Sequence, residues 1–588
     1  MRLESIKNLK KIIEIIQRKE NALAFSSLII LAFIIHHSAM NGFWRFDDGA
    51  HLKFVALYSP WQYFFIPSVM LEQSYAHITP YNVLFYEINL ALFGMESRWY
   101  YAHQILILGA TAFATYRLIR LWQDFIAALL AAILFLLGLP TLYVAQQLMT
   151  GHYSTGLLFS VISLYYFSLG IRQEKKKLIF GGALFYFLAT LCKELYVPLV
   201  LLLPFIPVGD VKKRIKAALP FVVIAAFYML WRYVVLGQLI GGYVATPVSL
   251  LDRFYQIASI PLLLLGWRPN LNKADYIMSH GSIHLLNILV ILGLMVIANY
   301  RKRLNWIFIG TSFILIIIPL WPLAGHAINE ANRYLFFVWW SCAVLIGVLS
   351  GSVKNMGREL LVKIASSISL CAILFFTQLS EFQQISLEIS RYDTLSRTAV
   401  DMNNSTALIV PLRYGFILGA RRAVDILRQQ DDTQKSAKFI LDKNSFCESV
   451  QKKFSILELN EECNCIKDVT HQWKMSLEKL LKYQAKSIPH VPLSVDMTFR
   501  DKWLQVDFGM YKDGIDFIFL GEEPIHFPKN FRIRWPGNKA LHFRIARQSP
   551  DGSLAVSPIL EFDMTKNAEF HWEGVSIVER VSCEFETK

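Results

Sequence analysis

The sequence predicts a polytopic α-helical membrane protein that ends in a soluble region. Of its 588 residues, 54% are hydrophobic and 14% are aromatic. The apolar residues gather in runs close to the length that crosses a bilayer, about 18–20 residues. After about residue 395 these runs stop, and short segments of alternating polarity follow. We therefore expect about 11 transmembrane helices followed by a C-terminal soluble α/β and β-sandwich-like region.

The apolar runs give approximate positions for the membrane helices. The expected helices are 23–40, 100–118, 124–140, 153–170, 178–192, 195–208, 217–236, 283–299, 305–323, 334–350 and 362–379. Lys and Arg collect in the N-terminal segment and in every second connection, as at Arg301-Lys302-Arg303. By the positive-inside rule the N-terminus lies in the cytoplasm and the C-terminal region outside. The chain is therefore expected to be a multi-pass protein of the cell inner membrane, with a periplasmic or extracellular C-terminal domain.

The expected domains follow from these boundaries. They are a basic cytoplasmic N-terminus at 1–22, a membrane domain at 23–380, a small α/β periplasmic region at 395–490 and a β-rich periplasmic domain at 491–588. Within the membrane domain, 41–99 is a long outer loop that is too apolar for a free loop, so we expect interfacial helices there. The net charge of +14 lies in short clusters between apolar runs. That distribution reflects membrane topology, and no nucleic-acid partner is expected.

Two adjacent carboxylates, Asp47 and Asp48, follow the first apolar run in the segment FWRFDDGAHLKF. Neighbouring like charges disfavour ionisation of both groups, and side chains of adjacent extended residues point to opposite sides. We expect one carboxylate to act on a substrate and the other to orient the loop or bind a cation. The alternative is a hydrated loop without chemistry. His51 and His77 are weaker candidates in the same loop, since a lone histidine is more often structural.

Two further groups of polar residues lie on the expected outer side. Lys193 and Glu194 interrupt two apolar runs, where a charge at membrane depth costs about 2.5–3.5 kcal/mol and usually has a function. A lysine there suits a phosphate, and a self-neutralising pair is the alternative. His326 and Arg333 lie between two late spans. Arg333 opens a helix and can bind a phosphate with two nitrogens, or it can simply extend to the membrane surface.

These motifs together resemble the GT-C glycosyltransferases. FDDGAHL is similar to the Asp-Asp or Asp-Glu motif of protein O-mannosyltransferases and of the lipid A aminoarabinose transferase. ATLCKELYVPLVLLLP resembles the Ser-Lys-Glu segment of the O-mannosyltransferases, and NRYLFF resembles their Glu-Arg-Tyr-Leu-Tyr. TPYNVLFYEINLALFG followed by WYYAHQ is similar to a further stretch of the same enzymes. Thr79 and Asn332 depart from the pattern, in which Arg and Glu stand at these places.

The resemblance implies that a sugar moves, with inversion, from a polyprenyl-phosphate donor to the hydroxyl of a glycan, lipid or protein acceptor. We expect Asp47 to be the general base and Asp48 its support, while which of the two takes the proton stays open. Lys193 and Arg333 are the expected phosphate ligands, and Glu194, His51, His77 and His326 are further substrate-binding candidates. No cofactor is expected, and a divalent cation at Asp47 and Asp48 stays open.

Two other functions stay open. One is a transporter or flippase for an envelope lipid, although transporters usually place charges near the bilayer midplane and contain repeats, and none is visible here. The other is a membrane anchor for the outer domain. In that domain we expect a disulfide between Cys447 and either Cys463 or Cys465, because the compartment is oxidising.

Overall fold

The computed structural model describes most of the chain. The described residues are 2–74, 76–239, 249–251, the single positions 253, 254, 257, 289, 291, 293 and 296, then 333–351, 357–403, 405–410, 414, 417–427, 438–440, 446, 449–450, 452–472, 475–476, 490–500, 503–509, 514–520, 523–527, 530–534, 540–549 and 554–577. The chain forms two compact units. The helical unit comprises Met1–Gly42, Ile78–Val234 and Leu250–Gln384, and the second unit comprises Phe43–His77, Val235–Ser249 and Ile385–Lys588.

The helical unit confirms the prediction of a membrane domain built from long apolar helices. Within the described residues, the helices long and apolar enough to cross a membrane are Lys19–Asn41, Leu148–Arg172, Val211–Leu236, Arg333–Gly351 and Glu359–Ser380. A sixth span results if the pair α7 (Phe125–Leu137) and α8 (Leu139–Ala145), bent by 57°, crosses as one. These coincide with six of the predicted helices. The total of about 11 stays a prediction.

The elements of this unit have the following bounds, and the last of them, α16, continues into the second unit at Ile385. They are α1 (Arg2–His36), η1 (His37–Asn41), α5 (Pro80–Phe93), α6 (Ser97–Ile119), η2 (Leu148–Thr150), α9 (Gly151–Arg172), α10 (Lys176–Cys192), η3 (Glu194–Phe205), α11 (Val211–Leu236), η5 (Arg333–Leu335), α15 (Phe336–Gly351) and α16 (Gly357–Asp401). The predicted helix 195–208 is a 3-10 helix at Glu194–Phe205. It contains Pro198 and Pro204, and a proline ring inside an α-helix clashes with the carbonyl four residues earlier. The predicted helices 283–299 and 305–323 lie almost wholly outside the described residues.

Close packing between α9 and its neighbours positions the residues discussed below. α9 packs along both α10 and α6. At Gly156 on α9, an added Cβ would lie only 2.3 Å from the ring of Tyr196 on η3. Only glycine allows this approach. The Tyr196 hydroxyl then donates a 2.6 Å hydrogen bond to the Tyr153 carbonyl, which fixes η3 against α9.

The second unit begins with short helices in the first outer loop. These are α2 (Asp48–Leu57), α3 (Pro60–Phe65) and α4 (Pro67–Gln73). α3 and α4 each begin with a proline, whose fixed φ and missing N–H suit the first helical position. Helices are therefore present where interfacial helices were predicted. Their position on a membrane surface stays a prediction.

The C-terminal part of this unit starts with a small α/β region. Its elements are β1 (Thr406–Ile409), α17 (Ile417–Leu427), β2 (Lys438–Ile440), β3 (Ser455–Asn460), β4 (Cys465–Asp468) and η7 (Thr470–Gln472). The strands form a sheet in the order β2-β1-β3-β4, in which β1 runs parallel to β2 and β3, and β4 is antiparallel to β3. Leu408, Val410, Ile417 and Leu459 form part of its core.

The disulfide prediction is wrong. Cys463 is bonded to Cys465, so neither is available to Cys447, which lies outside the described residues. The two cysteines lie at the turn between β3 and β4, where the chain reverses and Asn464 adopts a left-handed φ of 49°. This turn brings their Cα atoms to 5.3 Å, within the usual range for a disulfide.

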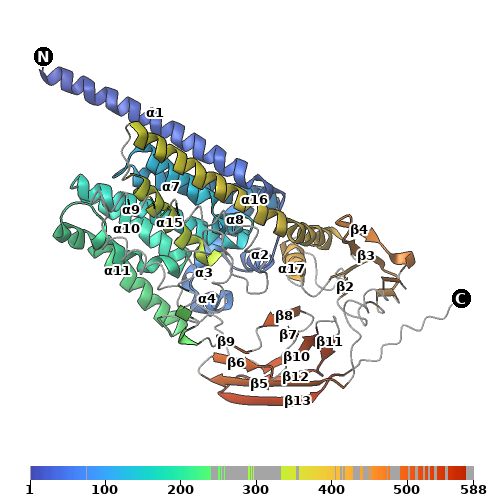
Figure 1. The fold of residues 1–588 in the computed structure, drawn as a ribbon. Coiled ribbons are helices and arrows are strands. Elements are labelled where there is room, and N and C mark those ends of the chain that lie inside the picture. Colours follow the sequence, from blue (N-terminus) through green and yellow to red (C-terminus); the bar gives the residue numbers. More distant parts are fainter. Residues whose placement is uncertain are drawn as a thin grey trace. The chain divides into compact units, whose positions relative to one another are not determined.

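A β-sandwich completes the second unit and agrees with the predicted β-rich region. Its strands are β5 (Pro492–Arg500), β6 (Trp503–Asp507), β7 (Ile515–Leu520), β8 (Glu523–Phe527), β9 (Asn530–Arg534), β10 (Ala540–Gln548), β11 (Leu554–Val556), β12 (Leu560–Asp563) and β13 (Ala568–Val575). One sheet has the order β13-β5-β6-β9, and the other has β11-β10-β7-β8 with β12 also paired to β10 (Figure 1). Val495, Val506 and Ile545 belong to the shared core.

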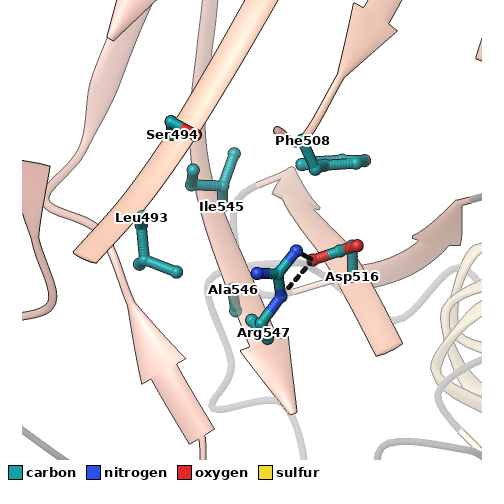
Figure 2. A pocket seen from close by; sticks show the side chains of 7 residues that line it. All are labelled: Leu493, Ser494, Phe508, Asp516, Ile545, Ala546 and Arg547. Atoms are coloured by element: carbon teal, nitrogen blue, oxygen red, sulfur yellow. Dashed lines mark hydrogen bonds and ion pairs between the residues drawn. The ribbon is translucent and has the colours of Figure 1, made fainter. Parts of the chain in front are cut away.

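A buried ion pair lies between the two sheets. Arg547 on β10 contacts Asp516 on β7 at 2.8 and 2.9 Å, beside Leu493 and Phe508 (Figure 2). The hollow there leaves no room for a water molecule. The pair therefore holds strands together and does not form a ligand site.

Candidate functional site

The acidic loop, defined here as Phe43–Leu57, separates its two carboxylates by environment. Asp48 is the first residue of α2 and is fully buried, and its Oδ2 accepts a 2.7 Å hydrogen bond from the backbone N–H of Arg45. Asp47, one residue earlier, is exposed. Between Arg45 and Asp47, Phe46 adopts a left-handed φ of 48°, which is unusual for a bulky side chain. The loop thus presents one carboxylate to solvent and holds the next one inside.

Two of the three predicted histidines, His51 and His77, lie among the described residues. His51 is half-buried on α2, and its backbone N–H donates to the Asp47 carbonyl at 3.1 Å. His77 is half-buried at the end of the same segment, and its backbone N–H donates to Ser74 Oγ at 3.1 Å. The structure therefore places His51 one helical turn from Asp47. His326 lies outside the described residues.

Lys193 lies at the turn between α10 and η3, outside the candidate spans. Its side chain is almost fully buried, with the residue only 8% exposed. Nζ lies 3.7 Å from Glu194 Oε1 and 5.4 Å from the ring centroid of Tyr153 on α9. The two predicted residues are thus brought together, and the ammonium lies over an aromatic face that attracts cations.

Arg333 begins η5 and lies over the neighbouring aromatic ring. Its guanidinium carbon is 5.1 Å from the ring centroid of Tyr334, and one of its nitrogens contacts Met149 Sδ at 3.6 Å. The rings of Tyr334 and Tyr153 meet edge to face with centroids 6.4 Å apart. Lys193 and Arg333 therefore lie on two aromatic rings that contact each other, although 140 positions separate them in sequence.

A third cation, which the sequence reasoning missed, belongs to the same group. Arg232 on α11 is buried, with 3% exposure, and it acts electrostatically on Lys193 together with Arg333. Burial lowers the pKa of the Lys193 ammonium; Glu194 opposes this, while Arg333 and Arg232 add to it. We call Lys193, Arg232 and Arg333 the cationic cluster. An arginine inside the apolar run 217–236 was the signal that could have found it.

The cationic cluster is suited to binding an anion. Three basic groups and one carboxylate, Glu194, lie among buried tyrosines. Charge-assisted hydrogen bonds from lysine and arginine are the usual means of binding a phosphate. No group of three or more His, Cys, Asp or Glu side chains placed to hold a metal ion occurs in the part of the chain that the structure describes.

Comparisons with known proteins find similarity to solved structures. No protein-family model matches the sequence. A search of curated proteins also found no match. A crystal structure of the Archaeoglobus fulgidus oligosaccharyltransferase, in complex with Zn and sulfate, aligns with a TM-score of 0.41 and 13% sequence identity, covering 82% of this chain and 72% of that one. This similarity is too low to assign a function.

Proposed function

We propose that this protein is a membrane glycosyltransferase that moves a sugar from a polyprenyl-phosphate donor to an acceptor hydroxyl. The observation that carries the proposal is the cationic cluster, in which Lys193 and Arg333 lie over two aromatic rings that contact each other and the buried Arg232 acts on Lys193. Three cations in an apolar helical unit suit a donor that joins an anionic phosphodiester to a hydrocarbon chain, and a leaving polyprenyl phosphate that gains a further negative charge.

The roles of the two carboxylates follow from their environments. Asp47 is exposed and can reach a substrate, whereas Asp48 is buried and hydrogen-bonded to the Arg45 backbone. We assign Asp47 as the general base and Asp48 as the group that shapes the loop. A carboxylate can take a proton from an alcohol as the new bond forms.

The proposed reaction is a single displacement. The acceptor oxygen attacks the anomeric carbon, a new C–O bond forms, and the bond from that carbon to the phosphate oxygen breaks. The acceptor proton passes to Asp47, and the electron pair of the broken bond leaves with the polyprenyl phosphate. The cationic cluster stabilises the negative charge that develops on this phosphate. No separate acid is needed because phosphate is a stable leaving group, and the configuration at the anomeric carbon inverts.

The remaining assignments belong to the same proposal. The acceptor is a glycan, lipid or protein outside the inner membrane, and Glu194, His51, His77 and His326 are further substrate-binding candidates. The step needs no cofactor, and a divalent cation at the acidic pair is tested by adding a chelator during the assay.

A transfer assay tests the proposal. The protein is purified in lipid nanodiscs and mixed with a radiolabelled polyprenyl-phosphate sugar and membranes from the host cell as the source of acceptor. We expect label to enter the membrane fraction and free polyprenyl phosphate to be released in equal amount. A flippase would instead move the intact donor across a bilayer without cleaving it, and that result would contradict the proposal.

A further inference from the structure

The acidic loop is hydrogen-bonded to the end of α16, about 350 residues away in the sequence. Arg45 forms a buried ion pair with Asp393, in which Nε donates to Oδ1 at 2.6 Å and a second nitrogen contacts Oδ2. The Phe43 N–H donates to the same Oδ1 at 3.1 Å. Asp393 therefore binds two residues of the loop that leads into the carboxylate pair.

Two further hydrogen bonds join the same segments. The Phe46 N–H donates to the Tyr392 hydroxyl at 3.1 Å, and Ser396 Oγ donates to the Trp44 carbonyl at 2.8 Å. With the bonds of Asp393, these contacts involve each residue from Phe43 to Phe46. One turn of α16 thus holds the whole approach to Asp47.

Phe46 anchors the loop in the core of the C-terminal α/β region. Its ring lies 5.2 Å from that of Tyr392 and packs against the core that contains Leu408 and Leu459. The left-handed φ of 48° at Phe46 is a strained conformation, which the surrounding contacts maintain. This turn is what directs the backbone from the anchored ring to the exposed carboxylate of Asp47.

The helix that follows the pair is held by the same region. Gly49 on α2 packs directly on α17: a Cβ at this position would lie 2.3 Å from the backbone N of Ala420. Beside it, Arg421 on α17 donates to the carbonyls of Ala399, Val400 and Met402 at the end of α16. Arg421 thereby joins the two helices that hold the loop.

We propose that the C-terminal end of α16 and the α/β region packed on it are part of the catalytic machinery, with Asp393 and Tyr392 on α16 as positioning residues for Asp47 and Asp48. They act through Arg45 and Phe46 and do not touch the substrate. The inference rests on the function proposed above and deepens it, because it assigns the region a role in the chemical step. A base misplaced by about 1 Å can lose about a hundredfold in rate, so loosening this contact is expected to lower kcat.

A matched pair of variants tests the proposal. Asp393→Asn and Asp516→Asn both leave a buried arginine beside a neutral amide in the same compact unit, but only Asp393 contacts the loop. We expect Asp393→Asn to lower kcat by about 10–100-fold while KM for the donor stays within about twofold. Asp516→Asn is expected to retain the wild-type kcat. Thermal unfolding of both variants reports their stability.

Hydrogen exchange supplies a readout that does not depend on activity. Asp393→Asn is expected to accelerate exchange at the amides of Phe43, Arg45 and Phe46, and Asp516→Asn is expected to leave them unchanged. If the wild-type protein transfers no sugar but this pattern is seen, the proposed function fails and the positioning of the loop stands. Unchanged exchange in Asp393→Asn would overturn the positioning, whatever the activity.

A milder variant covers the case in which Asp393→Asn does not fold. Tyr392→Phe removes only the hydroxyl that accepts from Phe46 and keeps the aromatic packing. We expect it to lower kcat and to accelerate exchange at Phe46 alone. An equal loss of kcat in Asp516→Asn would attribute these effects to general destabilisation and contradict the proposal.

Discussion

The acidic loop and the cationic cluster differ in which charged groups lie beside each other. In the loop, Arg45 is paired with Asp393, and Asp48 accepts a backbone hydrogen bond. In the cluster, Lys193 has one carboxylate partner, whereas the two arginines that act on it carry the same charge as it does. The loop thus holds an arginine and a carboxylate in direct contact, whereas the cluster holds a buried lysine on which two arginines act, an arrangement that suits a bound anion.

This difference assigns the two regions to different parts of a reaction. An ion-paired, hydrogen-bonded loop holds its geometry without a ligand, as a catalytic base requires. A group of like charges gains most when an anion binds, as a phosphate site requires. Substitutions in the loop should therefore change kcat alone. Substitutions in the cluster should weaken donor binding, in addition to any loss of kcat that arises from the charge developing on the leaving phosphate.

The largest effect is expected at Asp47. Asp47→Asn removes the proton acceptor and keeps the shape of the side chain, so kcat should fall by about 10²–10⁴-fold with little change in KM. The transfer assay measures it. Asp401→Asn, the same change at an exposed residue at the end of α16, is the control. Full activity of Asp47→Asn would remove the assignment of this residue as the base.

Lys193 comes next. Lys193→Gln removes a charge-assisted hydrogen bond, for which about 1.5–3 kcal/mol is typical, so KM for the donor should rise by about 10–150-fold. Arg232→Gln and Arg333→Gln are expected to act in the same direction. Lys213→Gln, at an exposed lysine paired with Glu174, is the control. A loss confined to kcat would place the cluster outside the ground-state donor site.

The pH dependence of donor binding distinguishes the buried Lys193 of the cationic cluster from an exposed lysine. Because the pKa of Lys193 is lowered, its ammonium loses the proton at a lower pH than an exposed lysine does. Donor affinity should be present below this pKa and fall as the pH rises through it. Lys193→Arg should move the fall to higher pH, and Arg232→Gln should do so more weakly. Titration of donor affinity between neutral and alkaline pH measures these shifts; coincident profiles for all three proteins would contradict the account.

The smallest effect concerns the contact between α2 and α17. Gly49→Ala places a methyl group against the backbone at Ala420, and overpacking of this kind costs about 1–3 kcal/mol of unfolding free energy. Gly419→Ala on the facing helix is the control, because its Cβ meets nothing within 4 Å. Thermal unfolding should therefore separate the two variants, with Gly419→Ala at or above the wild-type midpoint. If the Gly49→Ala protein is as stable as wild type, α2 and α17 can move apart without a loss of unfolding free energy, which would contradict this expectation.

The sequence predicted what depends on local pattern. Apolar runs of bilayer length located the long helices, alternation located most strands of the sandwich, and charges at the ends of apolar runs drew attention to Lys193 and Arg333. Tyr334, the aromatic residue beside Arg333, is also its neighbour in the sequence. Such features are visible without knowledge of distant contacts.

What the sequence did not predict depends on long-range contacts or on local backbone detail. Arg45 and Asp393 pair across 348 positions, and nothing near either residue indicates the partner. Arg232 lies within a run that was assigned only as a span. The Cys463–Cys465 bridge depends on the turn at Asn464, and two prolines convert the predicted helix 195–208 into a 3-10 helix.

The central claim is that the cationic cluster binds the lipid phosphate and the acidic loop does not. Binding of sugar-free polyprenyl phosphate to the purified protein in nanodiscs measures this directly. We predict that wild type and Asp47→Asn bind it equally, while the variant with glutamine at Lys193, Arg232 and Arg333 loses binding. Wild-type affinity in that triple variant, or loss of affinity in Asp47→Asn, would contradict the account.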